Sequence, residues 1–435
     1  MKTIDSIPVG KISRAGKLLS TGIKVGSNQL KYYGEKITDP KNAKRNLDVN
    51  NAEDIYNGLS QLKGSSLKVA QMLSMDKNIL PEAYVDKFSL SQFSVPPLSG
   101  PLVQKTFKRY FGKTAEELYD KFESESTHAA SIGQVHKAEK DGNALAVKIQ
   151  YPGVAESISS DLALVKPFAK QLLNLKGKEL EKYFKEVEGK LLEETDYLLE
   201  VDRSQLITQA CRVIPNIKFP TYYKDLSNER VITMDWMTGV HMSEFTSTNT
   251  DQPLADQIGQ TLWDFYMFQI HGLKEVHADP HPGNFLVDAE GNLIAIDFGC
   301  IKEIPDEFYV PYFELSNQAV MEDSTIFEQK LYELEILRED DSERERIFFK
   351  TFFKELLSLF TLPFNLKNFD FNNDEFFNAI AEKGQQLSKN PEFKKMNQNR
   401  GSKHFLYMNR TFFGLYNLLY SLKSKVEINH FKKYF

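Results

Sequence analysis

The stretch HADPHPGNFLVDAEGNLIAIDFG, residues 277–299, decides how this chain can fold. Asp279 stands in a proline-rich loop, and Asn284 follows five residues later. The next residues read as a β-hairpin that turns at Glu290-Gly291-Asn292 and leads to a second aspartate, Asp297. Polar side chains gathered on a loop beside a hairpin are typical of a functional site.

Two interpretations of this loop are open. In the first, a metal ion is bound by His277, Asp279 and His281. In the second, Asp279 does the chemistry, His277 braces the loop through a backbone hydrogen bond, and His281 does the same or contacts substrate. No cysteine and no third histidine follows at ligand spacing, which favours the second interpretation.

A hairpin is also predicted upstream, in SIGQVHKAEKDGNALAVKIQY, residues 131–151. The segment alternates in hydrophobicity and contains Asp141-Gly142, a strong signal for a tight turn. Its second strand carries Lys148. In phosphoryl transfer from ATP, a protein must neutralise phosphate charge, hold Mg²⁺ through oxygen ligands and orient the acceptor. Lys148 followed in order by the loop and hairpin of 277–299 predicts this chemistry.

Composition sets the broad class of protein. The chain has 435 residues, of which 41% are hydrophobic and 26% are charged, as in ordinary globular proteins. Cys211 and Cys300 are the only cysteines, so a disulfide framework and a Cys-based zinc site are excluded. The first residues lack a signal-peptide core, and no run of about 18 apolar residues is found. We expect a cytoplasmic protein that binds no nucleic acid.

Residues 1–45 form a basic leader with ten Lys/Arg and three Asp/Glu, whereas the whole chain has a net charge of −6. Apolar residues recur there at helical spacing, at Ile12, Ala15, Leu19 and Ile23. Such a helix can contact an anionic membrane surface peripherally. Alternatively, it is a solvated helix that packs its apolar stripe on the body of the protein.

The rest of the chain reads as helices around a small β-containing unit. A capping box at Thr114–Glu117 favours a helix start. The last 120 residues are helical and rich in aromatic side chains. The pattern predicts a two-lobed α+β protein. Further segments are expected to be helices at 50–95, 102–122, 155–175 and 178–208, a strand at 231–236 and an amphipathic helix at 255–273.

The ordered motifs resemble those of the UbiB/AarF family of atypical kinase-like proteins, which is associated with isoprenoid-quinone biosynthesis and lipid homeostasis. The resemblance covers roughly residues 50–425. It rests on these segments: LKVAQMLSMD (67–76), HAASIGQVHKA (128–138), LAVKIQYPGV (145–154), LEETDYLLE (192–200), VHADPHPGNFLVD (276–288), AIDFG (295–299) and MNRTFFGLYNLL (408–419).

The resemblance implies a bilobal protein-kinase-like fold with an N-terminal helical extension and a helical, aromatic-rich C-terminal region. Four parts are expected: the leader at 1–45, the extension at 46–100, an N-lobe with inserted helices at 101–237, and a C-lobe with C-terminal helices at 238–435.

The resemblance also implies a role for each matching residue. Lys148 and Glu200 form the ion pair of the nucleotide site, and Asp279 is the catalytic base. Asn284 and Asp297 are the Mg²⁺ ligands. The remaining nucleotide contacts come from an alanine-rich loop and a hinge: Ala129, Ala130, Ser131, Met234, Asp235, Trp236 and Met237.

A regulatory pair of signatures is implied as well. Lys68 and Gln71 match the family's K-x-G-Q motif, whose helix covers the cleft and blocks protein substrates. Glu194 and Asp196 match the partner motif E-x-D. Two positions depart from the pattern: Ala70 replaces a glycine, and His128 replaces the first alanine of the nucleotide loop.

The expected function is therefore Mg²⁺-dependent ATP hydrolysis or phosphoryl transfer that supports quinone biosynthesis or lipid homeostasis. The candidate partners are ATP or ADP, an isoprenoid-quinone precursor, and an anionic lipid at a membrane surface. Two alternatives stay open at this point. One is a nucleotide-gated lipid- or protein-binding module without chemistry, and the other is a small-molecule phosphotransferase.

Overall fold

The computed structural model describes residues 11–62, 83–84, 87, 97–129, 132–172, 178–389 and 400–435. The chain divides into two compact units. Unit 1 consists of Met1–Asp202 and Thr221–Trp236, and unit 2 consists of Arg203–Pro220 and Met237–Phe435.

Unit 1 contains a five-stranded antiparallel sheet in the order β1-β3-β4-β6, with β2 also paired to β3. Its centre is the predicted hairpin, which turns at Asp141 and Gly142 with φ of 51° and 81°. Two positive φ values in succession match the twist of a tight antiparallel hairpin. The strands are β1 (Lys121–Phe122), β2 (His128–Ala129), β3 (Gly133–Lys140), β4 (Asn143–Gln150) and β6 (Val231–Asp235).

Two helices, α5 (Gly100–Phe111) and α6 (Ala115–Leu118), precede the sheet. The buried ring of Phe107 on α5 meets Phe122 of β1 edge to face at 5.4 Å, which ties the helix to the sheet. The capping box predicted at Thr114–Glu117 is present and begins α6.

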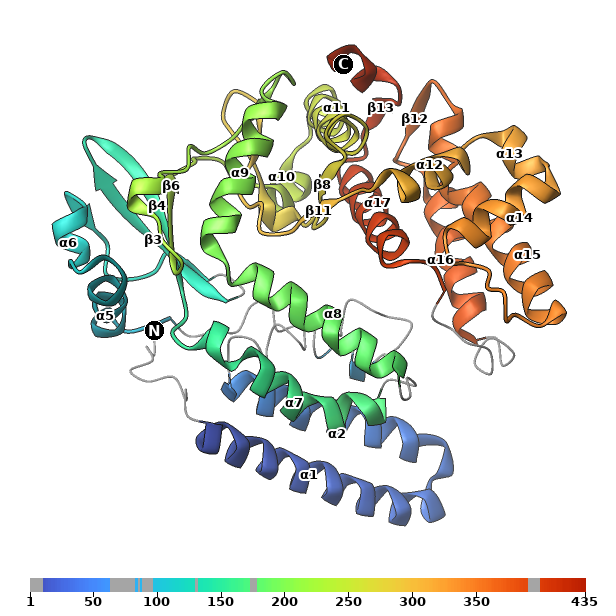
Figure 1. The fold of residues 1–435 in the computed structure, drawn as a ribbon, viewed down its shortest axis with the longest axis horizontal. Coiled ribbons are helices and arrows are strands. Elements are labelled where there is room, and N and C mark those ends of the chain that lie inside the picture. Colours follow the sequence, from blue (N-terminus) through green and yellow to red (C-terminus); the bar gives the residue numbers. More distant parts are fainter. Residues whose placement is uncertain are drawn as a thin grey trace. The chain divides into compact units, whose positions relative to one another are not determined.

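The first two described helices, α1 (Lys11–Thr38) and α2 (Pro40–Leu62), form an antiparallel hairpin (Figure 1). The Asn28 amide donates to Asp54 at 2.8 Å. The boundary predicted between the leader and the extension, at residue 45, lies within α2. Ile23, which belongs to the predicted apolar stripe, is 68% exposed, so packing of the stripe on the body is wrong for this residue.

Three more helices follow the central hairpin: α7 (Val154–Leu172), α8 (Lys178–Glu194) and α9 (Tyr197–Cys211). The single helical stretch predicted at 178–208 is broken at Thr195-Asp196. Asp196 starts the second helix, because its carboxylate accepts a hydrogen bond from the backbone N–H of Leu199 at 3.0 Å.

Unit 2 contains the second predicted hairpin within a four-stranded sheet in the order β5-β10-β9-β7. Its turn is stabilised by Asp288, whose carboxylate accepts from the backbone of Glu290 and Asn292, while Gly291 adopts φ of 81°. The strands are β5 (Ile217–Lys218), β7 (Val240–His241), β9 (Phe285–Val287) and β10 (Leu293–Ala295), with the separate pair β8 (Glu275–His277) and β11 (Ile301–Glu303).

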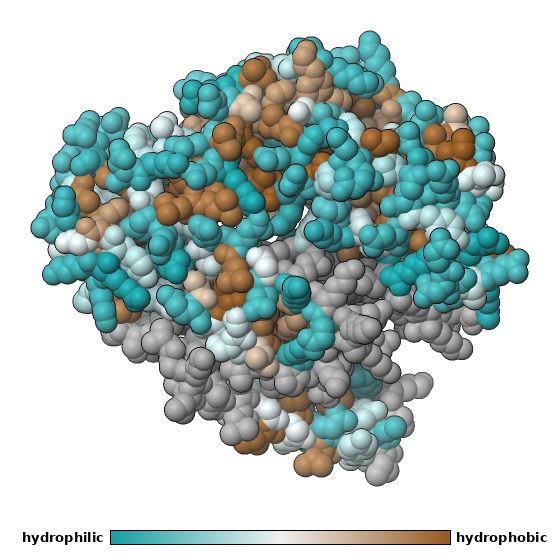
Figure 2. Space-filling model, in the orientation of Figure 1, coloured by the Kyte–Doolittle hydropathy of each residue, from teal (hydrophilic) through white to brown (hydrophobic). Residues whose placement is uncertain are grey.

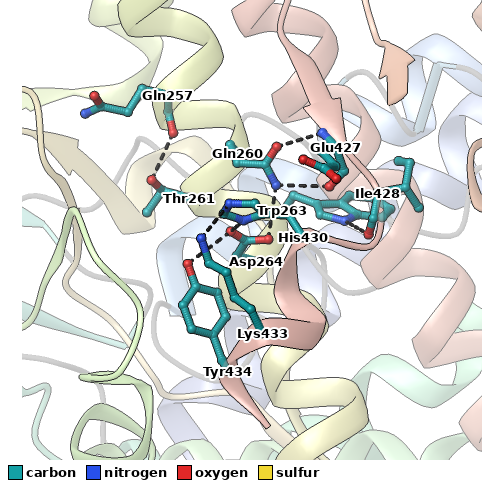
Figure 3. A network of polar contacts seen from close by, with 10 residues as sticks. All are labelled: Gln257, Gln260, Thr261, Trp263, Asp264, Glu427, Ile428, His430, Lys433 and Tyr434. Carbon is teal, nitrogen blue, oxygen red and sulfur yellow. Dashed lines mark hydrogen bonds and ion pairs between the residues drawn. The ribbon is translucent and has the colours of Figure 1, made fainter. Parts of the chain in front are cut away.

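Helix α11 (Gln252–Phe268) and the π-helix η3 (Gln269–Leu273) occupy the predicted amphipathic segment. That prediction is wrong for most of the segment, because every residue from 261 to 270 is buried. The indole N–H of Trp263 donates to the carbonyl of Ile428. The Asp264 carboxylate is hydrogen-bonded to Nδ1 of His430 at 2.5 Å (Figure 3). The last residues of the chain thus cover a face that the sequence pattern assigns to solvent.

The remainder of unit 2 is helical and rich in aromatic residues, as predicted. Tyr416 of α17 is fully buried among Phe360, Phe371 and Phe376. Within the described part of the chain, no helix is long and apolar enough to cross a membrane. The other elements are η2 (Lys224–Leu226), α10 (Met242–Thr248), η4 (Pro282–Asn284), α12 (Asp306–Glu314), α13 (Gln318–Glu322), α14 (Ser324–Glu333), α15 (Glu343–Phe360), η5 (Leu362–Asn365), β12 (Asn368–Asp370), α16 (Asp374–Lys389), α17 (Lys403–Leu422), β13 (Lys425–Glu427) and η7 (His430–Tyr434).

Candidate active site

Lys148 lies on β4, whose two neighbours β3 and β6 bury it in the sheet. Its Nζ donates to the Glu200 carboxylate of α9 at 2.7 Å. Side-chain exposure is 11% for the lysine and 7% for the glutamate, so the pair is formed out of water. The structure therefore brings together the two residues predicted to form this ion pair.

Tyr197, which the sequence analysis missed, adds a second contact to Lys148. The ammonium group lies 5.3 Å from the centroid of the tyrosine ring, and Tyr197 is three residues before Glu200 on one face of α9. A Cβ on Gly133 would lie 3.0 Å from the Tyr197 hydroxyl and 2.4 Å from the carbonyl oxygen of Ile149. Glycine at 133 thus permits the close packing of the start of β3 against β4 and this tyrosine.

The predicted nucleotide loop is described in part. The backbone of Ala129 belongs to β2 and pairs with Gln134, whereas Ala130 and Ser131 lie outside the described residues. His128, the departure from the family pattern, stacks on Trp236 with ring centroids 6.0 Å apart and an interplanar angle of 19°. The histidine thus joins the loop to the predicted hinge, a contact that no local pattern in the sequence could reveal.

The predicted hinge begins within the edge strand β6 and continues beyond its end. Met234 and Asp235 are paired with β4, and the backbone N–H of Trp236 continues the ladder to Ala144 at 2.9 Å. The Asp235 carboxylate accepts from the Tyr223 hydroxyl at 2.7 Å, and this bond raises the pKa of Tyr223 to about 12. Met237 is the first residue of this segment in unit 2.

In unit 2, backbone hydrogen bonds shape the loop that carries Asp279. The backbone N–H of His281 donates to the Asp279 carbonyl at 2.8 Å, and the Asn284 amide donates to the same carbonyl at 3.0 Å. Because its NH₂ group is committed to the loop, Asn284 can present its carbonyl oxygen as a ligand. The two ends of the predicted D-x-x-x-x-N spacing are therefore joined directly.

His277 is 1% exposed, and its Nδ1 lies 3.3 Å from the Tyr266 hydroxyl. Burial lowers the pKa of His277, although Asp279 and Asp297 oppose this effect, so the ring is neutral at pH 7. His281 accepts from the backbone N–H of Gly283 through Nδ1 at 3.1 Å. Within the described residues, no three His, Cys, Asp or Glu side chains are grouped closely enough to hold a metal ion. The His281 side chain therefore braces the loop, whereas the His277 side chain contacts Tyr266 of α11 rather than the backbone of the loop.

Asp297 follows β10, the second strand of the hairpin, and its carboxylate accepts from the backbone N–H of Gly299 at 2.8 Å. Phe298 is 1% exposed and packs against the His277 ring with centroids 5.7 Å apart. The backbone N–H of Ala278 donates to the Cys300 carbonyl at 2.8 Å. The segment after the hairpin is thus fixed to the start of the loop.

Gln269 is a second residue that the sequence analysis missed. It is fully buried at the start of the π-helix, where its Oε1 accepts from the backbone N–H of His277 at 2.9 Å. Its Nε2 donates to the carbonyl of Phe265 at 3.0 Å. Single-turn π-helices are common at functional sites, and this one presents Gln269 to the entrance of the loop.

Of the two predicted regulatory motifs, the structure describes only E-x-D. Lys68, Ala70 and Gln71 lie outside the described residues. Glu194 ends α8 and Asp196 directly precedes α9, so the E-x-D motif spans the break between these helices. Their predicted pairing with the K-x-G-Q motif stays a prediction.

A sheet lysine paired with a helix glutamate, a D-x-x-x-x-N loop and an aspartate after a hairpin define the class of protein-kinase-like proteins. A family model described as the ABC1 atypical kinase-like domain matches residues 90–331. This match covers more than half of the chain, so the chain belongs to the ABC1 atypical kinase-like family. The resemblance to UbiB/AarF proteins is confirmed.

Similar proteins come from distant organisms. The probable serine/threonine-protein kinase abkA of Dictyostelium discoideum is 25% identical over 477 residues, which cover 99% of this chain and 80% of the relative. Atypical kinase COQ8, mitochondrial, of Saccharomyces cerevisiae is 30% identical over 326 residues, which cover 73% of this chain and 65% of the relative. The match to the chloroplastic ACTIVITY OF BC1 COMPLEX KINASE 8 of Arabidopsis thaliana, 28% identical, spans 37% of that relative.

A solved structure shares the fold. The complex of Rv3197 with erythromycin from Mycobacterium tuberculosis matches with a TM-score of 0.60 at 24% sequence identity. The match covers 88% of this chain and 94% of that chain. A kinase-like fold with N-terminal helices and a helical C-terminal region is thus shown, and membership of the family implies ATP binding.

Proposed function

We propose that this protein is an atypical kinase or ATPase that binds ATP with Mg²⁺ and hydrolyses it or transfers its terminal phosphoryl group. The observation that carries the proposal is the buried ion pair between Lys148 and Glu200 at 2.7 Å. A buried ion pair contributes little net stability because desolvation offsets the attraction, so its retention favours a functional role.

Each residue of the set has a distinct task in this proposal. Lys148, oriented by Glu200 and Tyr197, neutralises phosphate charge. Asp279 orients the attacking hydroxyl or water and accepts its proton. The backbone bonds around Asp279 support this task, because a carboxylate held in one place loses little entropy when it meets the acceptor.

The residues proposed to hold Mg²⁺ suit that ion chemically. Asn284 offers an amide oxygen and Asp297 a carboxylate, and Mg²⁺ prefers such hard oxygen ligands. The Asn284 NH₂ bond to the Asp279 carbonyl favours an outward-facing carbonyl oxygen. When bound, the ion would neutralise charge on the nucleotide phosphates.

Quinone biosynthesis or lipid homeostasis is the proposed setting, supported by the family and by the yeast relative at 30% identity. The proposed acceptor is a small or lipid-linked molecule, because the K-x-G-Q helix with Lys68 and Gln71 is proposed to block protein substrates. The partners Glu194 and Asp196, at the break between α8 and α9, are proposed to receive that helix.

The test compares the wild-type protein with Asp297→Ala for ATP binding and phosphate release in the presence of Mg²⁺. We expect measurable turnover by the wild type and at least a ~100-fold loss in the variant. If the wild type binds nucleotide but releases phosphate no faster than the variant, the protein is a nucleotide-gated binding module instead. Absence of nucleotide binding would refute the proposal altogether. Ordinary turnover with choline or an aminoglycoside would favour the small-molecule phosphotransferase.

We further infer that α1 contacts an anionic membrane surface. Ile23 and Leu30 are one heptad apart on α1 and are 68% and 75% exposed, while Val25 and Asn28 are buried. Figure 2 shows hydrophobic residues at the surface along the lower edge, where α1 lies in Figure 1. Lys24 and Lys31 follow Ile23 and Leu30 directly and are exposed, and the Nζ of Lys24 also lies 3.7 Å from the Asp54 carboxylate of α2. Apolar residues beside lysines on one helix suit an anionic bilayer.

Vesicle sedimentation tests this contact. Ile23→Ser/Leu30→Ser should reduce binding to phosphatidylserine vesicles at least ~10-fold, and ~0.5 M salt should weaken the binding of the wild type. Val49→Ser on α2, where valine is 46% exposed, is the matched control and should bind like the wild type. Equal binding by all three proteins would exclude this surface.

A further inference from the structure

A cavity of about 290 Å³ lies in unit 2 beside the loop that carries Asp279. Its walls come from three segments that are far apart in the sequence. Met242 and Thr246 come from α10, Pro280 and Pro282 come from the loop, and a third wall is formed by α17. Ligand pockets begin at about 300 Å³, so this cavity suits a small molecule.

The lining has no charge. None of the described residues that border the cavity is ionisable. Met242 and Leu418 of the lining are buried, and the rings of Pro280 and Pro282 add aliphatic surface. A charged ligand would lose hydration without gaining a partner, so this lining favours an uncharged ligand with an aliphatic body.

Three polar side chains of the lining, those of Thr246, Asn417 and Ser421, donate hydrogen bonds to backbone carbonyls. The Ser421 hydroxyl donates to the Asn417 carbonyl at 2.9 Å, and the Thr246 hydroxyl donates to the Ser243 carbonyl at 3.1 Å. The Asn417 amide donates to the Phe413 carbonyl at 2.7 Å. A hydroxyl has only one hydrogen, so Thr246 and Ser421 can present only lone pairs to the cavity. A ligand group that faces Thr246 and Ser421 must therefore supply the hydrogen-bond donor.

We propose that this cavity is a binding site for a small, uncharged molecule with an aliphatic body and a hydroxyl group, such as an alicyclic alcohol. None of the residues that line the cavity belongs to the proposed nucleotide contacts, and its occupancy requires no ATP chemistry. Its walls include residues of α10 and α17, which have no role in the proposed phosphoryl transfer.

The position of the cavity gives the ligand an effect on the loop. A Cβ on Gly414 of α17 would lie 2.4 Å from Cγ of Pro280, so the helix backbone lies directly against that proline. Pro280 follows Asp279, and proline restricts the backbone on both sides of its peptide bond. A ligand wedged against Pro280 and Pro282 restrains the backbone of Asp279.

Ligand-observed NMR on the full chain, without nucleotide, tests the specificity. Cyclohexanol should bind saturably with a Kd on the order of 1 mM. Methoxycyclohexane, which lacks the donor, should bind at least ~5-fold more weakly. Cyclohexanecarboxylate, which is charged, should not bind. Absence of saturable cyclohexanol binding, or equal binding of the three probes, overturns the proposal.

A matched pair of variants tests the location. Ser243 borders the cavity from the exposed side of α10, so Ser243→Trp should fill it and weaken cyclohexanol binding at least ~10-fold. Thr248→Trp, at an exposed position of the same helix outside the cavity, should leave the Kd unchanged. Circular dichroism should show both variants folded. Equal affinities of the two variants would place the alcohol elsewhere.

Hydrogen exchange tests the effect on the loop independently of catalysis. Saturating cyclohexanol should slow exchange at least ~3-fold in a peptide covering residues 278–286, with no change in Ser243→Trp. Unchanged exchange at saturation overturns the coupling to the loop. Because the measurement needs no ATP, its outcome is distinct from failure of the proposed function.

Discussion

In unit 1 the candidate nucleotide lysine is held by other side chains, whereas in unit 2 the candidate catalytic loop is held by its backbone. Lys148 and Glu200 bury opposite charges at 2.7 Å. The shape of the loop around Asp279 comes from bonds to its carbonyl and from Gln269 behind it. Removing a charge in unit 1 must therefore affect folding, while removing the Asp279 carboxylate leaves the supporting bonds intact.

The largest expected effect follows from this difference. Asp279→Asn should lower the turnover of ATP by about 1,000-fold, since it removes the proton acceptor. The free energy of unfolding should change by less than ~0.5 kcal/mol, because the bonds that fix the loop use the backbone carbonyl of Asp279. Steady-state phosphate release and urea unfolding measure the two quantities. A large loss of stability would show that the loop depends on the side chain after all.

Lys148→Met should destabilise the fold by about 3 kcal/mol, because it leaves the Glu200 carboxylate buried without its partner. The double variant Lys148→Met/Glu200→Leu should recover most of this loss. Both proteins should bind nucleotide at least ~10-fold more weakly than the wild type. Urea unfolding of the single and double variants gives the coupling energy, and additive losses would contradict a buried ion pair.

Gln269→Leu tests the support of the loop from behind. It should cost about 2 kcal/mol, because the backbone N–H of His277 loses its acceptor in a buried place. We also expect kcat to fall with little change in KM for ATP, since the loop carries Asp279 and no nucleotide residue of unit 1. Gln257→Leu, exposed on α11, is the matched control and should cost less than ~1 kcal/mol. Equal losses of stability in the two variants would show that Gln269 does not support the loop more than an exposed glutamine does.

The smallest effect is a pH dependence that arises in unit 2. Burial lowers the pKa of His277 in the folded protein, so the unfolded chain binds the proton more tightly. Stability is therefore complete above the unfolded pKa of about 6.5 and falls with decreasing pH below it, by at most ~1.4 kcal/mol per pH unit.

Thermal unfolding between pH 7.5 and 5 measures this slope. The variant His277→Gln should show a smaller slope over the same interval, because the substituted side chain does not titrate. An unchanged slope would assign the pH dependence to the other histidines whose pKa burial lowers, His136, His271 and His404.

Local patterns were sufficient to predict the two hairpins that carry the candidate site residues. Asp141-Gly142 and Gly291 specify their turns through positive φ, a property of single residues and their neighbours. The kinase-like class and the family followed from the order of the motifs. The pairing of Lys148 with Glu200, 52 residues apart, came from the resemblance rather than from spacing.

The sequence could not reveal contacts that depend on tertiary packing. The face of α11 around Trp263 and Asp264 is covered by residues more than 160 positions later, so its burial overrides the amphipathic pattern. The ring of Tyr197 over Lys148 and the stacking of His128 on Trp236 likewise require the folded sheet. Gln269 was missed because a π-helix has no reliable local signal.

The π-helix at Gln269–Leu273 has a consequence for insertions and deletions. Removing one residue there would favour an ordinary α-helical turn, rotating everything that follows by about 100° and shortening the rise by about 1.5 Å. The chain would then enter the strand that begins the Asp279 loop out of phase with its partner strand. A length change in this turn should therefore be tolerated no better than a change within the loop itself, although none of its five residues belongs to the proposed catalytic set.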